Sequence, residues 1–417
     1  MQSNRDKTAI SHSPPSAAQA ARVYLDYNAT TPVDPAVLDA MLPFLGENFG
    51  NAGSVHTPGQ RARAAVDAAR DSVAALIGAE PNEIVFTSGG TEADNLALFG
   101  AVAASSKPRR HVITAAIEHH AILHACEELA RQGVGVTVVP VRTGADAQGV
   151  IDPEEIRRAI RPETVLISVM HANNELGTLQ PIEEIARIAA EAGVCFHCDA
   201  VQSAGKVPLD VKRLGVDLLS LSAHKFCGPK GVGALYIRAG RQITPRAWGG
   251  HAEHDRRAGT ENVPGIVGIG KAAELARRLL TDDSARIRSL RDRLENALLE
   301  RIPNIRVNGD RAHRVPNTSN ISFPGAGGEA LLIALDLQGL ACSTGAACSS
   351  GSTEPSHVLL AAGLSHDDAR SSLRFSLGRP TTAADIDRAL EIIPAVVARI
   401  RALSPREQEA TAAMRAR

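Results

Sequence analysis

Aromatic side chains are scarce in this chain, since Phe, Trp and Tyr together make up 3% of its 417 residues. Net charge is nearly absent as well, because 45 basic residues balance 46 acidic ones. A chain without a basic surface or stacking aromatics offers no electrostatic case for binding nucleic acid. No apolar run approaches the roughly 20 residues that a membrane-spanning helix needs. The composition therefore favours a protein that binds neither nucleic acid nor a membrane.

Cysteine is also sparse, with six residues in the chain. So few cysteines in a chain of this length do not form a disulfide framework, and we expect a reduced, cytoplasmic setting. Residues 1–21 are rich in Ser, Ala and Pro and lack a hydrophobic segment. They are predicted to be a disordered leader rather than a signal or transit peptide. Residues 406–417 are predicted to be a frayed tail.

Short apolar runs alternate with amphipathic stretches between Glu83 and Ile237. This alternation predicts an α/β fold with a mostly parallel, seven-stranded sheet covered on both faces. Active sites in such sheets lie at the carboxyl ends of the strands. The predicted strands are residues 84–87, 111–115, 136–140, 165–169, 194–198, 218–221 and 233–237, and predicted helices between them are residues 91–103, 121–132, 153–160 and 182–192.

The pattern changes after Pro264, which indicates a second, smaller α+β domain. Two helical stretches rich in Ala, Leu and Arg are predicted over residues 265–280 and 284–302. A mixed segment follows over residues 304–378, and residues 382–403 form a last amphipathic helix. We predict a large domain of residues 34–275 and a small domain that combines residues 22–33 with 276–405.

Two segments about 120 residues apart carry the chemistry. Residues 222–236 read SAHKFCGPKGVGALY and contain Lys225, and residues 342–352 read CSTGAACSSGS and contain Cys348. A lysine suited to a Schiff base, together with an accessible thiol, predicts pyridoxal-phosphate chemistry with a cysteine nucleophile. Taken singly, Lys225 could be a surface lysine and Cys348 an inert thiol. A buried structural cysteine is not expected in so polar a loop.

A phosphate site is predicted where residues 84–87 run into a helix. Gly89 and Gly90 allow backbone N–H groups to approach an anion at the helix N-terminus, and Thr91 adds a hydroxyl. Taken alone, an ordinary strand–helix turn with Thr91 as the N-cap explains this segment better. Ser222 and His224, beside Lys225, offer further phosphate donors.

Other polar residues also follow predicted strands. Asp199 leaves a buried strand, where a carboxylate needs a cation such as a protonated pyridine nitrogen. Gln202 could bind the ring oxygen, and His119 could stack on the ring and move protons. Asn174 completes the set. Each of these residues has an ordinary structural explanation, but together they place one cofactor site at one edge of the sheet.

Longer segments match a known family in a fixed order along the chain. They are YLDYNATTPVDP from Tyr24, TSGGTEADN from Thr87, MHANNELG from Met170, HCDAVQSAGK from His197, SAHKFCGPKG from Ser222, RAGTEN from Arg257, EPSHVL from Glu354 and RFSLGR from Arg374. The chain resembles the cysteine desulfurases of iron–sulfur cluster assembly, which are fold-type-I pyridoxal-phosphate enzymes. The Cys348 loop resembles that of their nitrogen-fixation and housekeeping branch.

The resemblance implies a role for each matching residue. Lys225 would hold the cofactor as an aldimine, and Cys348 would attack the sulfur of L-cysteine, leaving a persulfide and releasing L-alanine. Thr260 would bind the phosphate of a neighbouring subunit, which implies a homodimer, and the persulfide would pass to an acceptor such as an iron–sulfur scaffold protein. By the same resemblance, the catalytic residues are Cys348, Lys225 and His119; the cofactor-binding residues are Gly90, Thr91, His119, Asn174, Asp199, Gln202, Ser222, His224, Lys225 and Thr260; and the substrate-binding residues are Arg374 and Asn174.

Two segments depart from the family pattern. Residues 249–255 read GGHAEHD where members usually carry a glycine-rich run with Glu-Arg-Gly, and Cys227 stands where an aromatic residue or histidine is usual. Three alternatives stay open: another fold-type-I enzyme such as an aminotransferase, which has no use for Cys348; a selenocysteine lyase; and a non-catalytic sulfur-transfer scaffold. Cys195 and Cys198 match C-x-x-C, but a strand sends them to opposite faces, so no metal site is expected.

Overall fold

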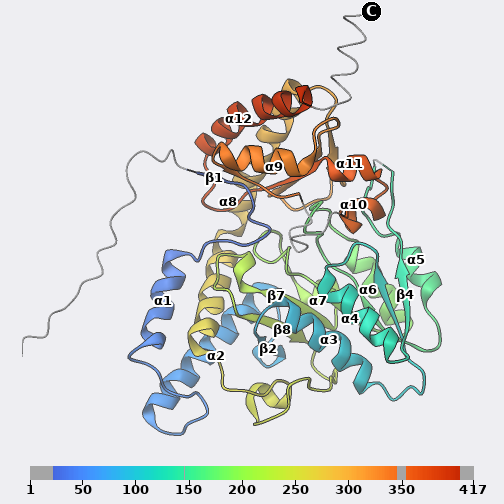
Figure 1. Ribbon diagram of the computed structural model, residues 1–417. Coiled ribbons are helices and arrows are strands. Elements are labelled where there is room, and N and C mark those ends of the chain that lie inside the picture. Colours follow the sequence, from blue (N-terminus) through green and yellow to red (C-terminus); the bar gives the residue numbers. More distant parts are fainter. Residues whose placement is uncertain (1–21, 145, 345–353, 404–417) are drawn as a thin grey trace, which may run out of the picture.

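The structure is a computed structural model that describes residues 22–144, 146–344 and 354–403. The predicted leader, the predicted tail and Cys348 lie outside the described residues. In Figure 1 the large sheet and the helices around it fill the lower part of the view. A smaller group of strands and helices lies in the upper part. The predicted α/β class is therefore confirmed.

The large sheet contains seven strands: β2 (Ile84–Thr87), β3 (His111–Ala115), β4 (Gly135–Val139), β5 (Thr164–Ser168), β6 (Cys195–Asp199), β7 (Leu218–Ser222) and β8 (Gly233–Ile237). Their order across the sheet is β2-β8-β7-β6-β5-β3-β4. β8 runs antiparallel to β2 and β7, and the other pairs are parallel. Continuous apolar runs rich in β-branched residues suit strands that are buried on both faces.

Helices cover both faces of this sheet. Alternate residues of β3 separate into two apolar clusters, with Ile113 in one and Val112 in the other. The first cluster includes side chains of α2 (Thr57–Ile77), α6 (Ile182–Glu191) and the first half of α8 (Val263–Arg301). The second includes α3 (Gly90–Ala104) and α4 (His120–Arg131). The remaining helices beside the sheet are α1 (Pro35–Leu45), α5 (Pro153–Ala159), α7 (Val211–Leu214) and the short 3-10 turns η1 (Pro81–Glu83), η2 (Ala223–Lys225) and η3 (Ala252–Asp255).

The upper part of Figure 1 has an apolar cluster of its own. Its three-stranded antiparallel sheet has the order β12-β10-β9, and β1 pairs in parallel with β11. Because β1 pairs with β11, the first described residues belong with the last part of the chain. The elements are β1 (Val23–Tyr24), β9 (Arg306–Asn308), β10 (Thr318–Ser322), β11 (Leu340–Ala341), β12 (Ser372–Ser376), α9 (Gly328–Leu337), α10 (His357–Ala361), α11 (His366–Arg370) and α12 (Ala383–Ala402).

One continuous helix joins the two apolar clusters. The prediction of two helices, ending at 280 and starting at 284, is wrong, because α8 runs unbroken for 39 residues. The segment Thr281, Asp282 and Asp283 includes neither Gly nor Pro, the residues that most often break a helix. The backbone can therefore stay helical through it. Ile266 packs in the cluster of the large sheet that contains Ile113, and Leu294 packs in the upper cluster. The predicted domain boundary at residue 275 falls inside this helix and stays a prediction.

No helix among the described residues is both long and apolar enough to cross a membrane.

Candidate active site

Most of the predicted site residues line one cavity of about 340 Å³. It opens at the ends of β5, β6 and β7, where the sheet meets the segment before α1 and strand β12. Strands, turns and the α3 N-terminus that lie far apart in the sequence converge here. The predicted residues that line the cavity are Gly90, Thr91, His119, Asn174, Asp199, Gln202, Ser222, His224, Lys225 and Arg374.

The first turn of α3 forms one wall. Its leading amides have no partner within the helix, so they and the helix dipole favour an anion. A Cβ added at Gly90 would lie 2.7 Å from Cγ2 of Val201, so only glycine lets this backbone approach the neighbouring loop. Ser222 lines the same cavity, and Nδ1 of His224 lies 3.1 Å from Oγ1 of Thr30. This wall suits a phosphate group.

Asp199 is the last residue of β6 and is 6% exposed. Its Oδ1 accepts a hydrogen bond from the Val201 amide at 2.9 Å. Burial raises the pKa of Asp199. The hydrogen bond from the Val201 amide and the positive charge of Lys225 oppose that rise. A buried carboxyl that faces a cavity is stabilised as an anion when a cation binds beside it.

Lys225 ends the short turn η2 after β7. Its Nζ donates to the backbone carbonyl oxygens of Asn28 at 2.6 Å and Ala29 at 2.9 Å. Gln202 is buried, and its Nε2 donates to the same Asn28 carbonyl at 3.0 Å. The segment before α1 therefore holds the amine at the mouth of the cavity.

His119 caps the N-terminus of α4. Its Nδ1 accepts from the Ala121 amide at 3.1 Å, so the hydrogen of the neutral ring lies on Nε2. Burial, and then the charge of Lys225, lower the pKa of His119 to about 4. The ring is therefore neutral at pH 7, which suits it to stack on a flat ligand and to accept a proton.

Arg374 lies in the middle of β12 and is 2% exposed. Its Nη1 donates to the Asn174 carbonyl oxygen at 3.0 Å, and its Nη2 to Oδ1 of Asp26 at 2.7 Å. Its buried Nε has no hydrogen-bond partner among the described residues. A guanidinium held in this way presents a fixed donor face to a carboxylate.

Three residues of the site were missed by the sequence reasoning. Asn28 and Asp94 line the cavity, and Lys206 bonds to two of its lining residues. Asn28 and Lys206 lie inside the motifs that begin at Tyr24 and His197, and Asp94 lies inside TSGGTEADN. Their position in those motifs was the available signal, but residue type alone does not assign a buried Asn, Asp or Lys to a cofactor site.

The donor set fits pyridoxal phosphate. The α3 N-terminus with Ser222 suits its phosphate, Asp199 suits its ring nitrogen and Lys225 its aldehyde. Gly90, which has no room for a side chain, keeps the anion-binding wall open. The residues present therefore match each polar part of this cofactor.

Comparisons with known proteins show which family the chain resembles. The family model for class-V aminotransferases matches residues 23–389. The cysteine desulfurase IscS of Methanosarcina thermophila is 52% identical over 383 residues, which cover 92% of this chain and 94% of that protein. The corresponding protein of Dictyoglomus turgidum is 49% identical over 387 residues, covering 93% of this chain and 97% of that protein.

Solved structures agree too. A structure described as a NifS-like protein has a TM-score of 0.84 and 38% sequence identity, and covers 90% of this chain and 99% of its own. One described as SspA in complex with cysteine has a TM-score of 0.76 and 37% identity, and covers 85% of this chain and 98% of its own. The chain belongs to the cysteine desulfurases. Within the class-V aminotransferase family, these are enzymes that depend on pyridoxal phosphate.

Thr260 of this cysteine desulfurase does not line the cavity and is exposed. Residues 249–255, which differ from the family pattern, include η3. There Glu253, His254 and Asp255 have left-handed φ angles of 50°, 56° and 64°. Glu253 is buried and pairs with Arg70 at 2.7 Å. Its Oε2 also accepts from the Phe86 amide of β2 at 2.9 Å. The altered segment therefore has a defined, anchored conformation.

The other unusual cysteines are buried rather than exposed. Cys227 is 7% exposed, and burial raises the pKa of its thiol. Cys342 packs in the upper cluster, as expected for a core residue, and burial raises its pKa too. Cys195 and Cys198 lie on β6, three residues apart. Across the described ranges, no group of three or more His, Cys, Asp or Glu side chains is placed to hold a metal ion.

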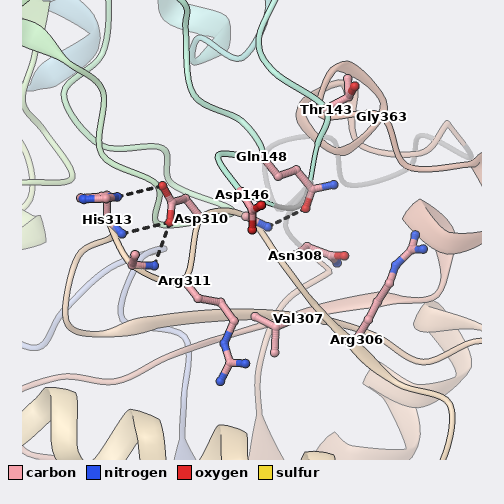
Figure 2. A pocket seen from close by; sticks show the side chains of 12 residues that line it. Thr143, Asp146, Gln148, Arg306, Val307, Asn308, Asp310, Arg311, His313 and Gly363 are labelled. Carbon is pink, nitrogen blue, oxygen red and sulfur yellow. Dashed lines mark hydrogen bonds and ion pairs between the residues drawn. The ribbon is translucent and has the colours of Figure 1, made fainter.

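A second, larger cavity of about 740 Å³ lies between the loop before α5 and the segment after β9. Figure 2 shows the hydrogen bonds that Asp310 and Gln148 make with neighbouring groups of this cavity. Asp310 accepts from the amides of Ala312 at 2.8 Å and His313 at 3.1 Å, and Gln148 accepts from the Gly309 amide at 2.8 Å. None of the predicted site residues lines this cavity. Asp310 and Gln148 therefore support the local backbone.

Proposed function

We propose that this enzyme converts L-cysteine to L-alanine and leaves the sulfur as a persulfide on Cys348, for transfer to an acceptor protein such as an iron–sulfur scaffold. The observation that carries the proposal is the single cavity in which Lys225, Asp199, His119 and Arg374 meet. Bound pyridoxal phosphate would supply an electron sink for charge that develops on the substrate. The remaining chemistry belongs to the side chains.

Substrate orientation is assigned to Arg374. Because its guanidinium is buried and fixed by Asn174 and Asp26, it can bind the α-carboxylate of cysteine without first becoming ordered. Asn174 lies beside it in the same cavity. Together they would direct the amino group toward Lys225 and leave the thiol on the open side.

Proton transfer is assigned to Lys225 and His119. Nζ of Lys225 would take the α-proton of the substrate and return a proton to the product. His119, whose pKa is lowered to about 4 by burial, is neutral at working pH and would stack on the cofactor ring; it could relay the thiol proton of the substrate only by passing that proton on to a stronger base. Asp199 would hold the ring nitrogen in its protonated form.

Sulfur transfer is assigned to Cys348, which lies outside the described residues. Its thiolate would attack the substrate sulfur, so that a sulfur–sulfur bond forms and the carbon–sulfur bond breaks. The electron pair of the broken bond stays with carbon, which takes up a proton to become the methyl group of alanine. No outside oxidant is needed, because the two electrons that the two sulfur atoms lose in forming the persulfide are gained by the substrate carbon that becomes the methyl group.

The proposal is tested by measuring alanine release from L-cysteine in the presence of a thiol reductant. Cys348→Ala should abolish release while the protein keeps its yellow cofactor absorbance. Cys126→Ala, which removes a buried thiol of α4 outside the cavity, serves as the matched control and should leave turnover unchanged. Equal alanine release from the wild type and Cys348→Ala would remove Cys348 as the nucleophile and favour a lyase.

A further inference from the structure

Lys206 is a half-buried lysine that the proposed mechanism does not use. It follows β6 on the segment that carries Gln202, and its Nζ donates to Oε1 of Gln202 at 2.8 Å and to Oδ1 of Asn28 at 3.0 Å. Burial, then the positive charges of Lys225 and Arg374, lower the pKa of Lys206 well below its usual value. No carboxylate pairs with Lys206 among the described residues. Burial and the neighbouring positive charges both disfavour a charged lysine at this position. Its presence there therefore calls for a functional explanation.

The first consequence concerns the Gln202 amide. Nζ of Lys206 donates one hydrogen bond to Oδ1 of Asn28 and another to Oε1 of Gln202, so the amide atom that faces Lys206 is the oxygen. The amide nitrogen then points the other way and donates to the Asn28 carbonyl at 3.0 Å. A flipped amide would set its oxygen against that carbonyl and its NH2 against the ammonium. Lys206 therefore fixes which end of Gln202, a lining residue of the cavity, is offered to the cofactor ring.

The second consequence concerns Lys225. The Asn28 carbonyl that accepts from Gln202 also accepts from Nζ of Lys225 at 2.6 Å. Asn28 is itself held on both sides, since its Nδ2 donates to the Asn174 carbonyl at 3.0 Å and its Oδ1 accepts from Asn317 at 3.0 Å. Nζ of Lys206 is thus held close to the amine of Lys225 through one shared residue, Asn28.

Several other charges face Lys225. Asp199 lies on the opposite side and favours the protonated amine, and His119 and His224 are neutral because burial lowers the pKa of each to about 4. Arg374 lines the same cavity. Asp199 and the two carbonyls favour protonation of Lys225, whereas the neighbouring side chains of Lys206 and Arg374 oppose it, and the same repulsion between Lys225 and Lys206 lowers the pKa of Lys206. A neighbouring cation is a known way to make a lysine nucleophilic.

We propose that Lys206 is a positioning residue of the cofactor site, which orients the Gln202 amide toward the ring and keeps the Lys225 amine ready to lose its proton. The inference rests on the proposed function in one respect only, which is the reaction in which Lys225 gives up its proton. Its contacts with Gln202 and Asn28 do not depend on which amino acid is the substrate.

The test compares Lys206→Met, which removes the charge, with Lys206→Arg, which keeps it. Lys206→Gln, polar and neutral, is the second variant if Lys206→Met does not fold. Lys271→Met is the matched control, because Lys271 pairs with Glu274 on α8 away from the cavity. One readout is the pH at which the absorbance band of the bound cofactor changes. The other, in protein stripped of cofactor, is the pH dependence of Lys225 acetylation, followed by mass spectrometry.

In Lys206→Met both midpoints should rise by about one pH unit, since a neighbouring cation no longer opposes protonation. kcat should fall roughly tenfold with KM nearly unchanged, because substrate binding by Arg374 is untouched. Lys206→Arg should restore both midpoints. If they stay at the wild-type values while thermal stability alone falls, Lys206 is merely structural and the inference is wrong. If the wild type releases no alanine yet the midpoints still shift, the proposed function fails and this inference stands.

Discussion

At the scale of single residues, the cofactor site gathers more buried carboxyl groups than its chemistry requires. Asp94 of α3 lines the same cavity as Asp199 and is 2% exposed, and its Oδ1 has no hydrogen-bond partner among the described residues, lying 3.7 Å from Nε2 of His197. Burial, and then the charge of Asp199, raise the pKa of Asp94 well above its usual value. Asp94 therefore holds its proton more tightly than an exposed carboxyl group does.

This leads to a prediction for Asp94→Asn. A carboxyl whose pKa is raised by folding binds its proton more tightly in the folded state, so stability falls as the pH rises through the folded-state pKa. Asn cannot ionise and escapes that loss. Asp94→Asn should therefore be more stable than the wild type at pH 8, by about 1–2 kcal/mol, and the difference should shrink toward pH 5. Urea unfolding of the cofactor-free protein at both pH values measures it.

Glu92, two residues earlier on α3, provides a control of opposite sign. Burial alone would raise its pKa, but hydrogen bonds from Arg257 and Ser88 lower it. Its stabilising contribution is present above the unfolded-state pKa and is lost as the pH falls. Glu92→Gln should therefore be slightly less stable than the wild type at pH 8. An Asp94→Asn variant that loses stability at pH 8 as Glu92→Gln does would show that Asp94 is ionised in the folded protein.

At the scale of elements, η3 stores backbone strain in an anchored segment. Asp255 has a φ of 64°, a conformation that glycine adopts without cost, and its side chain meets His251 on the surface at 2.6 Å. Asp255→Gly should raise the free energy of unfolding by roughly 0.5–1 kcal/mol, because relief of left-handed strain outweighs an exposed ion pair. Asp39→Gly, within α1, should lower it, since glycine weakens a helix. Thermal unfolding of both variants checks the difference, and a less stable Asp255→Gly would contradict it.

The elements also show what the sequence can and cannot predict. β2, β3 and β8 have the predicted bounds because buried strands carry unbroken apolar runs with clear ends. The continuity of α8 was missed, because polar residues 281–283 resemble a break when only periodicity is considered. The ring centroids of His120 on α4 and His357 on α10 lie 4.7 Å apart, a contact that spacing along one helix cannot predict.

At the scale of the whole molecule, the site depends on both apolar clusters. Arg374 comes from the upper sheet, Asp199 and Lys225 come from the large one, and Asn28 lies on the segment that passes between them. Each group follows from a local motif, which is why most of the cavity could be predicted from the sequence. The hydrogen bonds that join Asn28, Gln202 and Lys206 could not, because they depend on distances between segments that only the folded chain sets.

Apolar side chains on α1 and the segment after it lie open to solvent. Leu42 and Leu45 are on the helix, and Phe49 and Val55 are 83% and 89% exposed. A monomer rarely leaves such a group uncovered. We propose that a second copy of the chain covers this face, and that Thr260, which is exposed and does not line the cavity of its own subunit, reaches the phosphate in the partner's cavity.

Mixing two inactive variants tests both parts of this proposal. Lys225→Ala has no amine for the cofactor, and Thr260→Ala lacks the hydroxyl offered to the partner. If Thr260 acts across the interface, a mixed dimer contains one site with Lys225 from one subunit and Thr260 from the other, so alanine release should reappear when the two proteins are unfolded together and refolded. If Thr260 acts within its own subunit, no site in the mixture is complete and release stays at the level of the separate variants. A single-subunit mass for the wild type in sedimentation would contradict the proposed dimer directly.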